Sequence, residues 1–371
     1  MLSMGIFSAR AETPGFGYIN RQSVKVRQGM DEKIIYSLPE GHCVYVLSVW
    51  QDKKENTWYR FVTQRQQDGV WTVRRGWVPA EYVDVNGAAF SDIVQISAGD
   101  SGFLALREDG TVTGCARVIN ATSAFDKKVA SWENAVSVTA GLNTYACIFE
   151  DGTTEAFGLY AYGMDGETAS GIRCDAIGNK RRTMVTEGGE MISNAPLRFV
   201  YPADGPTSLS GIRKIAQDEY SLFMLMEDGT VACASPEEET GYFQIEPTDT
   251  PDFENWTDIV DIDTTLWHPD GAYFFEVFGA VKADGTVAAW PRRIELMADG
   301  WTDVVSLSLA PSYMMALRAD GGVYAAGYEK KIVQEVQTWT DIVQISAAAD
   351  YCVGLKKNGS LVFAGDFEYS R

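Results

Sequence analysis

A short pattern recurs seven times in this sequence, with an internal spacing that hardly changes. Each copy opens at an apolar residue and later reaches a glycine at a turn, and in six copies that glycine follows the opening residue by 17 positions. The six pairs are Ile93 and Gly110, Ala135 and Gly152, Ile172 and Gly189, Ile212 and Gly229, Val304 and Gly321, and Ile342 and Gly359. Between Ile259 and Gly285 the spacing is 26, so the fifth copy has nine added residues. A fixed spacing with variable linkers indicates a repeated structural unit.

We predict that each copy forms strand, turn, strand, hairpin and strand. In the first copy Asp109-Gly110 separates two β-like runs. This pair suits a type I′ hairpin turn, whose two central residues both need positive φ. A unit of three or four strands cannot bury both faces alone, whereas neighbours in a closed ring cover one another. The pattern therefore predicts an all-β fold in which residues 88–371 form a seven-bladed β-propeller and residues 170–192 supply the third blade.

The last copy, residues 339–365, resembles the regulator-of-chromosome-condensation (RCC) repeat, and the likeness extends over most of residues 88–371. The resemblance implies a β-propeller. It implies no single function, because the family includes nucleotide-exchange factors, ubiquitin-ligase modules and many bacterial proteins. The histidine usual after the Ala-Gly segment is absent, and tyrosines stand in that neighbourhood instead: Tyr145, Tyr220, Tyr313 and Tyr351. We therefore carry over no exchange activity.

Residues 15–87 show short alternating runs with turn signals, which is typical of a small β-barrel. Segments 24–29 and 76–83 match the Val-x-Val-Arg-x-Gly and Gly-Trp-Val-x-x-x-Tyr-Val signatures of the bacterial SH3-like domain. The whole stretch resembles that domain, which is common in envelope and extracellular proteins. The resemblance implies contact with cell-wall polymer or peptide.

Charge divides the chain near residue 88. Residues 15–87 carry ten Lys and Arg against eight Asp and Glu, and residues 88–371 carry twenty against forty-two, so the net charges are +2 and −22. This asymmetry indicates a domain boundary. The total of −20 argues against nucleic acid as a partner, because that affinity comes from cations on phosphates. No apolar run is long enough to predict a transmembrane segment.

Residues 1–14 begin with a short apolar stretch and contain Ala9-Arg10-Ala11, the small-x-small form of a signal-peptidase site. Two interpretations stay open: a truncated signal peptide and a disordered N-terminus. Together with the envelope-type domain that follows, this segment favours an extracellular or envelope-associated protein. A cytoplasmic location is the alternative.

The six cysteines form no metal-binding pattern. They lack a CxxC pair and a histidine at ligand spacing: Cys43, Cys115, Cys147, Cys174, Cys233 and Cys352. Most lie in β-like runs, which favours small buried residues, and the sequence does not assign disulfides. Asp258, Asp261 and Asp263 lack the spacing of a calcium loop. We therefore predict no metal and no other cofactor.

The added residues of the fifth copy form one candidate ligand-binding site. They bring together Trp267, His268, Tyr273 and Phe275. Lengthened loops on a scaffold often carry function, so we consider a hairpin that contacts a ligand or a partner. Packing of these aromatic side chains on their own blade is the alternative.

A second candidate lies in the N-terminal module. Trp50 and Trp71 are candidates for a shallow aromatic groove, because rigid rings give contact area at low entropic cost. We predict that Trp58 and Trp77 belong to the barrel core. The basic cluster at residues 180–182 is expected to pair with neighbouring acids.

The sequence contains no Gly-x-Ser-x-Gly elbow, Walker loop or His-Glu-x-x-His motif, and we predict no catalytic residue. We expect a non-enzymatic binding or scaffold protein of the bacterial envelope. In this interpretation the SH3-like domain contacts cell-wall polymer or peptide, and the propeller is an interaction platform. One alternative is an envelope hydrolase or lyase with carboxylates converging in the propeller channel. Another is a cytoplasmic interaction hub.

Closure of the ring needs a contribution beyond the seven copies. The last copy provides only three strands, so we expect the N-terminal side to add to it. Two alternatives stay open: residues 84–92 supply a fourth strand, or the last sheet has none.

Overall fold

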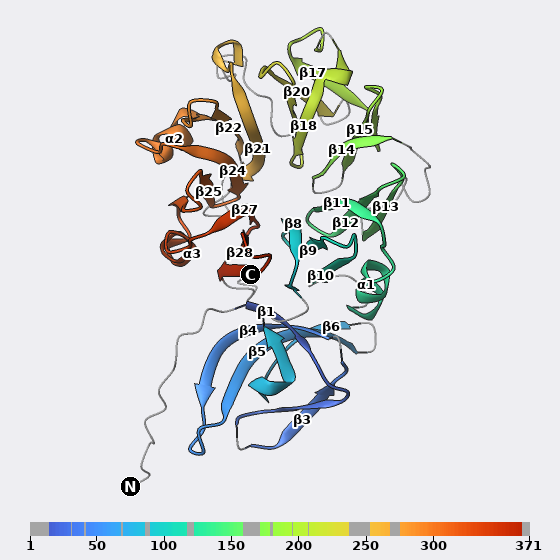
Figure 1. Ribbon diagram of the computed structural model, residues 1–371, viewed down its shortest axis with the longest axis vertical. Helices are drawn as coiled ribbons and strands as arrows, with labels where there is room; N and C mark the ends of the chain where they lie inside the picture. Colours follow the sequence, from blue (N-terminus) through green and yellow to red (C-terminus); the bar gives the residue numbers. More distant parts are fainter. Residues whose placement is uncertain are drawn as a thin grey trace.

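The computed structural model describes residues 15–365 apart from 31, 41, 68–69, 86–89, 117–121, 159–170, 179–180, 195, 207, 237–252 and 268–274. Over this part of the chain the fold is all-β in character, as the repeats predict. A larger sheet built from the N-terminal strands lies beside many small antiparallel sheets that surround a common centre (Figure 1). No described helix is long and apolar enough to cross a membrane.

The N-terminal strands form one antiparallel sheet, in which seven strands are described in the order β3-β2-β6-β5-β4-β1-β7. On β2, Val24 and Val26 are buried while Lys25 between them is exposed. This alternation gives the sheet one apolar face, where Phe61 and Val78 complete the core. The strands are β1 (Gly15–Ile19), β2 (Val24–Arg27), β3 (Ile34–Leu38), β4 (Cys43–Gln51), β5 (Thr57–Gln67), β6 (Val70–Pro79) and β7 (Val83–Val85).

The remaining described strands form seven small sheets that follow one another in chain order around the centre (Figure 1). Six sheets have three described strands each and the fourth has four. The first three sheets are β8 (Ile93–Gly99), β9 (Gly102–Arg107), β10 (Val112–Ala116); β11 (Ala135–Ala140), β12 (Thr144–Phe149), β13 (Thr154–Gly158); and β14 (Ile172–Ile177), β15 (Arg182–Thr186), β16 (Met191–Ser193). The fourth and fifth are β17 (Leu197–Tyr201), β18 (Ile212–Gln217), β19 (Leu222–Met226), β20 (Val231–Pro236); and β21 (Ile259–Trp267), β22 (Phe275–Lys282), β23 (Val287–Trp290). The last two are β24 (Val304–Ala310), β25 (Tyr313–Arg318), β26 (Val323–Gly327); and β27 (Ile342–Ala347), β28 (Tyr351–Lys356), β29 (Leu361–Gly365).

In each small sheet one strand, here called the first strand, begins at the opening residue of its sequence copy; in the fourth sheet this is β18, because β17 precedes the copy. These seven strands are β8, β11, β14, β18, β21, β24 and β27. In each of them the second residue is a β-bulge. All seven turn glycines have φ between +77° and +83°, a region that other residues rarely adopt. The sequence repeat is therefore a repeat of backbone conformation.

The hairpin turns differ from the predicted type I′ geometry. In the first sheet Gly110 donates its amide to the carbonyl of Arg107 at 3.0 Å, and only the glycine has positive φ. This is a type I turn followed by a glycine bulge, so the prediction of type I′ was wrong. Asp109 is placed here for another reason: its carboxylate accepts from the hydroxyl and the amide of Thr111, at 2.6 and 2.9 Å. These bonds also lower the pKa of Asp109.

Backbone hydrogen bonds join neighbouring sheets. The carbonyl of a turn glycine accepts from the opening amide of the following sheet, for example at 2.9 Å between the first and second sheets. The same bond joins the last sheet to the first, from the amide of Ile93 to the carbonyl of Gly359 at 3.2 Å. Gln344 adds a second link, accepting from the amide of Ile96 at 2.8 Å and donating to its carbonyl at 3.0 Å. The sheets therefore form a closed ring.

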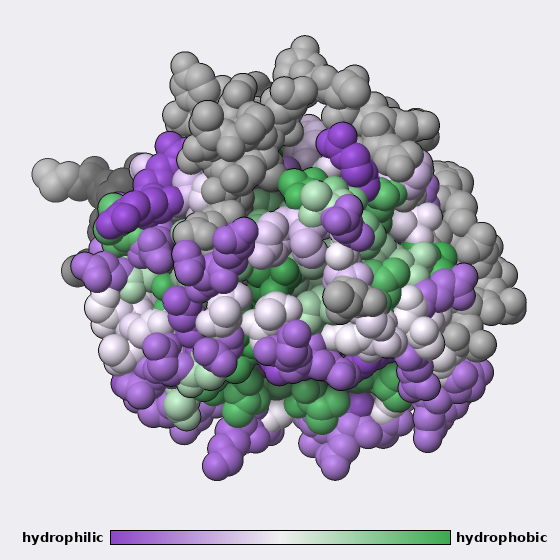
Figure 2. Space-filling view, turned by 90° about the horizontal axis from the view of Figure 1, so that it is seen from above, coloured by the Kyte–Doolittle hydropathy of each residue, from purple (hydrophilic) through white to green (hydrophobic). Residues whose placement is uncertain are grey.

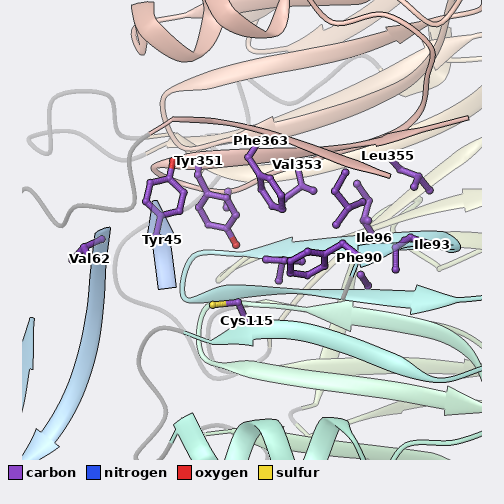
Figure 3. Packing of buried hydrophobic residues seen from close by; sticks show 14 residues of the cluster. Tyr45, Val62, Phe90, Ile93, Ile96, Cys115, Tyr351, Val353, Leu355 and Phe363 are labelled. Carbon is purple, nitrogen blue, oxygen red and sulfur yellow. The ribbon is translucent and has the colours of Figure 1, made fainter. Parts of the chain in front are cut away.

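The N-terminal sheet packs on the junction between the last and first sheets of the ring. Tyr45 and Val62 share an apolar cluster with Phe90 and with buried residues of β8, β9, β28 and β29 (Figure 3). Tyr45 also donates its hydroxyl to the carbonyl of Gly365. No described residue of 84–92 adds a strand to the last sheet, since β7 pairs with β1. Within the described residues the N-terminal side therefore contributes packing to the last sheet, and no fourth strand.

Short helices contact the third strands of three sheets, with α1 on β10, α2 on β23 and α3 on β26. A recurring tryptophan follows each helix. Trp132 and Trp339 are buried between neighbouring sheets, and Trp301 stacks on Tyr324 at 5.3 Å between ring centroids. The described helices are α1 (Thr122–Val129), α2 (Arg292–Glu295), α3 (Lys330–Val336) and the single-turn 3-10 helices η1 (Ala80–Tyr82), η3 (Leu209–Gly211), η4 (Phe253–Asn255) and η5 (Leu296–Ala298).

The end of the molecule farthest from the N-terminal sheet is largely hydrophilic. Polar and charged side chains cover much of it, and apolar patches lie between them (Figure 2). This surface belongs to the part of the chain whose net charge is −22.

Candidate functional site: carboxylates at the central cavity

A cavity of about 600 Å³ lies at the centre of the ring, and the first strands of all seven sheets line it. Alanine, glycine, serine and threonine make up much of the lining. Charged side chains are also present, mainly from the third, fourth and fifth sheets: Asp100, Asp175, Lys214, Asp218, Glu219 and Asp263. Carboxylates therefore gather on one side of this cavity.

Lys214 on β18 reaches towards two aspartates of the next sheet. Its Nζ lies 2.6 Å from Oδ1 of Asp261, whose Oδ2 accepts from the hydroxyl of Ser306 at 2.8 Å. Asp263 accepts from the amide of Leu309 at 2.7 Å. Burial raises the pKa of Asp263 to about 6, against the opposing effect of Lys214. These bonds connect three consecutive sheets, so the group first of all fixes their positions relative to one another.

The third sheet contains a buried ion pair between Asp175 on β14 and Arg182 on β15. Both side chains are 2% exposed, and Oδ2 of Asp175 lies 2.9 Å from Nη2 and 3.1 Å from Nε of Arg182. Thr139 of the second sheet donates to Asp175 at 2.6 Å, and Arg182 donates to Thr154. The interface between the second and third sheets is thus partly polar. For Arg182, the expectation that the basic cluster at 180–182 pairs with acids is confirmed.

A second buried group joins the fourth and fifth sheets. Asp218 follows β18 and accepts from the amides of Tyr220 and Ser221, both at 2.8 Å. Its other oxygen accepts from the hydroxyl of Thr264 on β21 at 3.1 Å. Glu276 on β22 accepts from the hydroxyl of Ser221 at 2.6 Å. Ser221 therefore contacts both carboxyl groups, through its amide and its hydroxyl.

Burial raises the pKa of both carboxyl groups. For Glu276 burial is the main cause and the charge of Asp218 adds to it, so that the pKa rises to about 8. For Asp218 burial outweighs the hydrogen bonds that would lower the pKa. Two neighbouring buried carboxyls disfavour double ionisation, so the pair retains a proton at neutral pH. Such a group can donate a proton in general acid catalysis.

The candidate residues of the fifth copy lie only partly within the described chain. Trp267 is buried at the end of β21, with its ring 6.5 Å from that of Phe275. Phe275 is partly buried, and the guanidinium of Arg293 lies 3.6 Å from its ring centroid. His268 and Tyr273 lie outside the described residues. Trp267 also lies edge-on to Tyr328 at 6.4 Å, and the structure therefore packs Trp267 and Phe275 in an apolar cluster shared by the fifth and sixth sheets rather than on their own sheet alone.

The N-terminal candidates are also only partly described. Trp50 is partly buried, donates its indole N–H to Ser48 at 2.8 Å and lies edge-on to Trp77 at 6.0 Å. Trp71 lies on β6, and its side chain is outside the description. Trp58 is buried, in agreement with its expected place in the core. Trp77 is only partly buried and lies outside the core cluster, so the same prediction was wrong for this residue.

The cysteines differ in state. Cys115 is disulfide-bonded. Cys147, Cys233 and Cys352 are buried free thiols, and Cys174 is a partly buried one. Burial raises the pKa of Cys147 to about 12, which keeps this thiol protonated. No group of three or more His, Cys, Asp or Glu within the described ranges is arranged to hold a metal ion.

Sequence reasoning overlooked Asp218 and Glu276, although one signal was available. Five other copies have Gly or Ala at the position of Asp218, six residues after the opening, so an aspartate there departs from the pattern. Glu276 gives a weaker signal, since it only borders the added residues of the fifth copy. Its contact with Ser221 spans 55 residues and follows from the lengthened strands of the fifth sheet.

No family model and no curated protein matches this chain. Among solved structures, the ectodomain of the Physcomitrella patens receptor kinase CR4 is 15% identical, with 74% of each chain covered and a TM-score of 0.48. Human WBSCR16 is 11% identical over 97% of this chain and 100% of that one, with a TM-score of 0.46. Yeast RCC1 (Prp20), in its complex with Kap60, is 12% identical over 96% and 90%, with a TM-score of 0.38. Such identities transfer no function to this chain.

Proposed function

We propose that this chain is a binding scaffold, in which residues 88–371 form a seven-bladed RCC-type β-propeller and residues 15–87 an SH3-like barrel. The observation that carries the proposal is the hydrogen bond between turn glycine and opening residue, which recurs where the last sheet meets the first. A ring joined in this way holds its loops in fixed positions, which suits recognition of a partner.

We further propose an extracellular or envelope location, with cell-wall polymer or peptide as the ligand of the N-terminal module. The disulfide at Cys115 supports this location, because disulfides persist in oxidising compartments. The resemblance of residues 15–87 to an envelope-type domain supports it as well. Trp50 and Trp71 are the proposed contacts in this module, and Trp267, His268, Tyr273 and Phe275 remain candidates for a second contact.

Co-sedimentation with purified peptidoglycan tests the ligand. The shared core at Tyr45 joins the module to the ring, so point variants of the full chain are preferable to a truncation. We expect the full chain to sediment with peptidoglycan, Trp50→Ala to weaken this and Ile35→Ala, at a 41% exposed position of the same sheet, to leave it unchanged. Absence of binding by the unaltered protein would refute the cell-wall role. Equal binding by both variants would remove Trp50 from the contact.

An envelope hydrolase or lyase is the second candidate, and one observation favours it. Asp218 lines the central cavity, and with Glu276 it forms a buried pair that retains a proton. Cleavage of a glycan needs a carboxylic acid that protonates the leaving group. Release of reducing ends from peptidoglycan by the wild type, and its loss in Glu276→Gln, would support this candidate. No release by the wild type would remove it.

A further inference from the structure

Four valines are exposed at equivalent positions of the ring. Val94, Val136, Val305 and Val343 are each the bulged second residue of a first strand. Their exposed fractions lie between 46% and 54%, although valine is among the residues most often buried in proteins. Single exposed apolar residues need no explanation, but the same exposure at one repeated position marks a surface.

The remaining sheets show where this surface begins and ends. Val260 occupies the bulge of the fifth sheet and is partly buried, whereas the third and fourth sheets have Arg173 and Arg213 there. Valine therefore occupies the bulge in five sheets: the fifth, sixth, seventh, first and second. These five are consecutive around the ring, because the seventh sheet adjoins the first. We call these five residues the valine arc: Val94, Val136, Val260, Val305 and Val343.

The valine arc lies at one end of the ring, together with the hairpin turns. At six of the seven junctions, including all five that carry a valine, the turn glycine bonds to the opening residue of the next sheet, and the bulge immediately follows that opening residue. Gly110 is thus 2.9 Å from the amide next to Val136, and Gly359 is 3.2 Å from the amide next to Val94, measured from the glycine carbonyl. Side chains of the turns therefore flank the valines.

These flanking side chains are strongly acidic. The turns and the residues just before the openings hold ten exposed acids beside the five arc positions: Asp92, Glu108, Asp109, Glu227, Asp228, Asp258, Asp284, Asp303, Asp320 and Asp341. Glu227 and Asp320 form ion pairs with Arg173 and Arg318. Lys357 is the exposed base at the same turn positions. An apolar arc is thus bordered by a negative rim.

We propose that the valine arc is a docking surface for a cationic segment of another protein that carries apolar side chains. The valines would lose water on contact with the apolar side chains, and the acidic rim would attract the positive charges and speed association. The same rim repels nucleic acid, anionic lipid and a second copy of this acidic chain. The inference rests on the proposed scaffold function and specifies its face and its partner chemistry.

The test is binding of a fluorescent amphipathic peptide of leucine and lysine to the full chain, measured by anisotropy. The double variant Val94→Arg, Val343→Arg should keep the fold, because the third and fourth sheets already have arginine at this bulge. Ile34→Arg, Ile35→Arg adds the same charge at two exposed positions of β3 and is the matched control. We expect the arc variant to bind about tenfold more weakly and the control to bind nearly as the wild type.

Several outcomes would overturn the proposal. One is binding of the peptide by the arc variant as tight as by the wild type, and another is an equal loss in both double variants. A wild type that dimerises where the arc variant is monomeric would assign the surface to a second copy. Binding of phosphatidylserine vesicles to the arc would assign it to lipid.

The proposed function and this inference fail separately. The arc variant should sediment with peptidoglycan as the wild type does, because that contact is assigned to the N-terminal sheet. A wild type that binds peptidoglycan but not the peptide refutes the valine arc alone. A wild type that binds the peptide but not peptidoglycan refutes the cell-wall role alone.

Discussion

Replacement of Glu276 by glutamine should remove most of the pH dependence of stability between pH 6 and 8. The pKa of Glu276 is raised by burial from an ordinary value of 4.5 to about 8. In this window the unfolded chain has already lost the proton that the folded chain still holds. Stability of the fold therefore falls as pH rises from 4.5 towards 8, by about 1.4 kcal/mol per unit at most.

Integrated from pH 6 to pH 8, the loss of unfolding free energy amounts to about 2 kcal/mol. It stays below the maximum slope over two full units because Glu276 begins to ionise in the folded chain near pH 8. Asp263, whose pKa is about 6, contributes less over the same interval since it is already half ionised at its start. Glutamine keeps an oxygen that can accept from Ser221 and has no proton to lose. Urea unfolding of the wild type should therefore show a lower unfolding free energy at pH 8 than at pH 6. The variant Glu276→Gln should show little of this difference.

The matched control is Glu133→Gln, at an exposed position of the ring. It should show the same loss as the wild type. If Glu276→Gln loses as much stability as the wild type between pH 6 and 8, Glu276 does not hold the proton. The variant Asp218→Asn then separates two explanations. In one, Asp218 holds the proton of the pair, and in the other the two carboxyl groups share no proton.

Two further predictions concern the ion pair and the cysteines. Arg182→Leu should cost about 3–5 kcal/mol of unfolding free energy, because Asp175 would remain buried without its partner. The double variant Asp175→Ile, Arg182→Leu should recover most of the lost unfolding free energy in urea, since the fourth sheet has Ile215 and Leu222 at the equivalent positions. A double variant as unstable as Arg182→Leu alone would contradict this prediction. Thiol titration of the denatured, unreduced protein should find four of the six cysteines free, because one disulfide is present; six free thiols would contradict the disulfide and weaken the proposed location.

The repeat could be predicted from the sequence because each of its marked residues has a fixed backbone role. The turn glycine supplies a φ that other residues avoid, and its carbonyl must reach the next opening amide. In every copy the opening residue pairs with the residue three before the turn glycine, so the spacing of 17 in six copies reflects equal lengths of the first two strands. The added residues of the fifth copy fit this rule, because they lengthen β21 and β22 beyond the other first and second strands rather than altering the junction.

The polar groups at the cavity could be predicted less well. Asp175 and Arg182 each occupy a position where other copies have apolar residues, such as Ile215 and Leu222. Two opposite charges at such positions of one copy indicate an ion pair, so this pair could be predicted from the sequence. The pairing of Asp218 with Glu276 depends instead on how two sheets lie side by side. Alignment of repeats locates unusual residues, but it does not tell which neighbour they will meet.

The closed ring is tested most directly by a distance measured between spin labels. Cysteines placed at Val94 and Asn358 carry labels across the junction of the first and last sheets, and cysteines at Val136 and Asp109 form the matched pair across the first and second. The wild type, treated in parallel, gives the background from native thiols. A closed ring predicts short and similar distance distributions for the two pairs. A much longer distance between positions 94 and 358 than between 136 and 109 would show an open arrangement of sheets and contradict the ring.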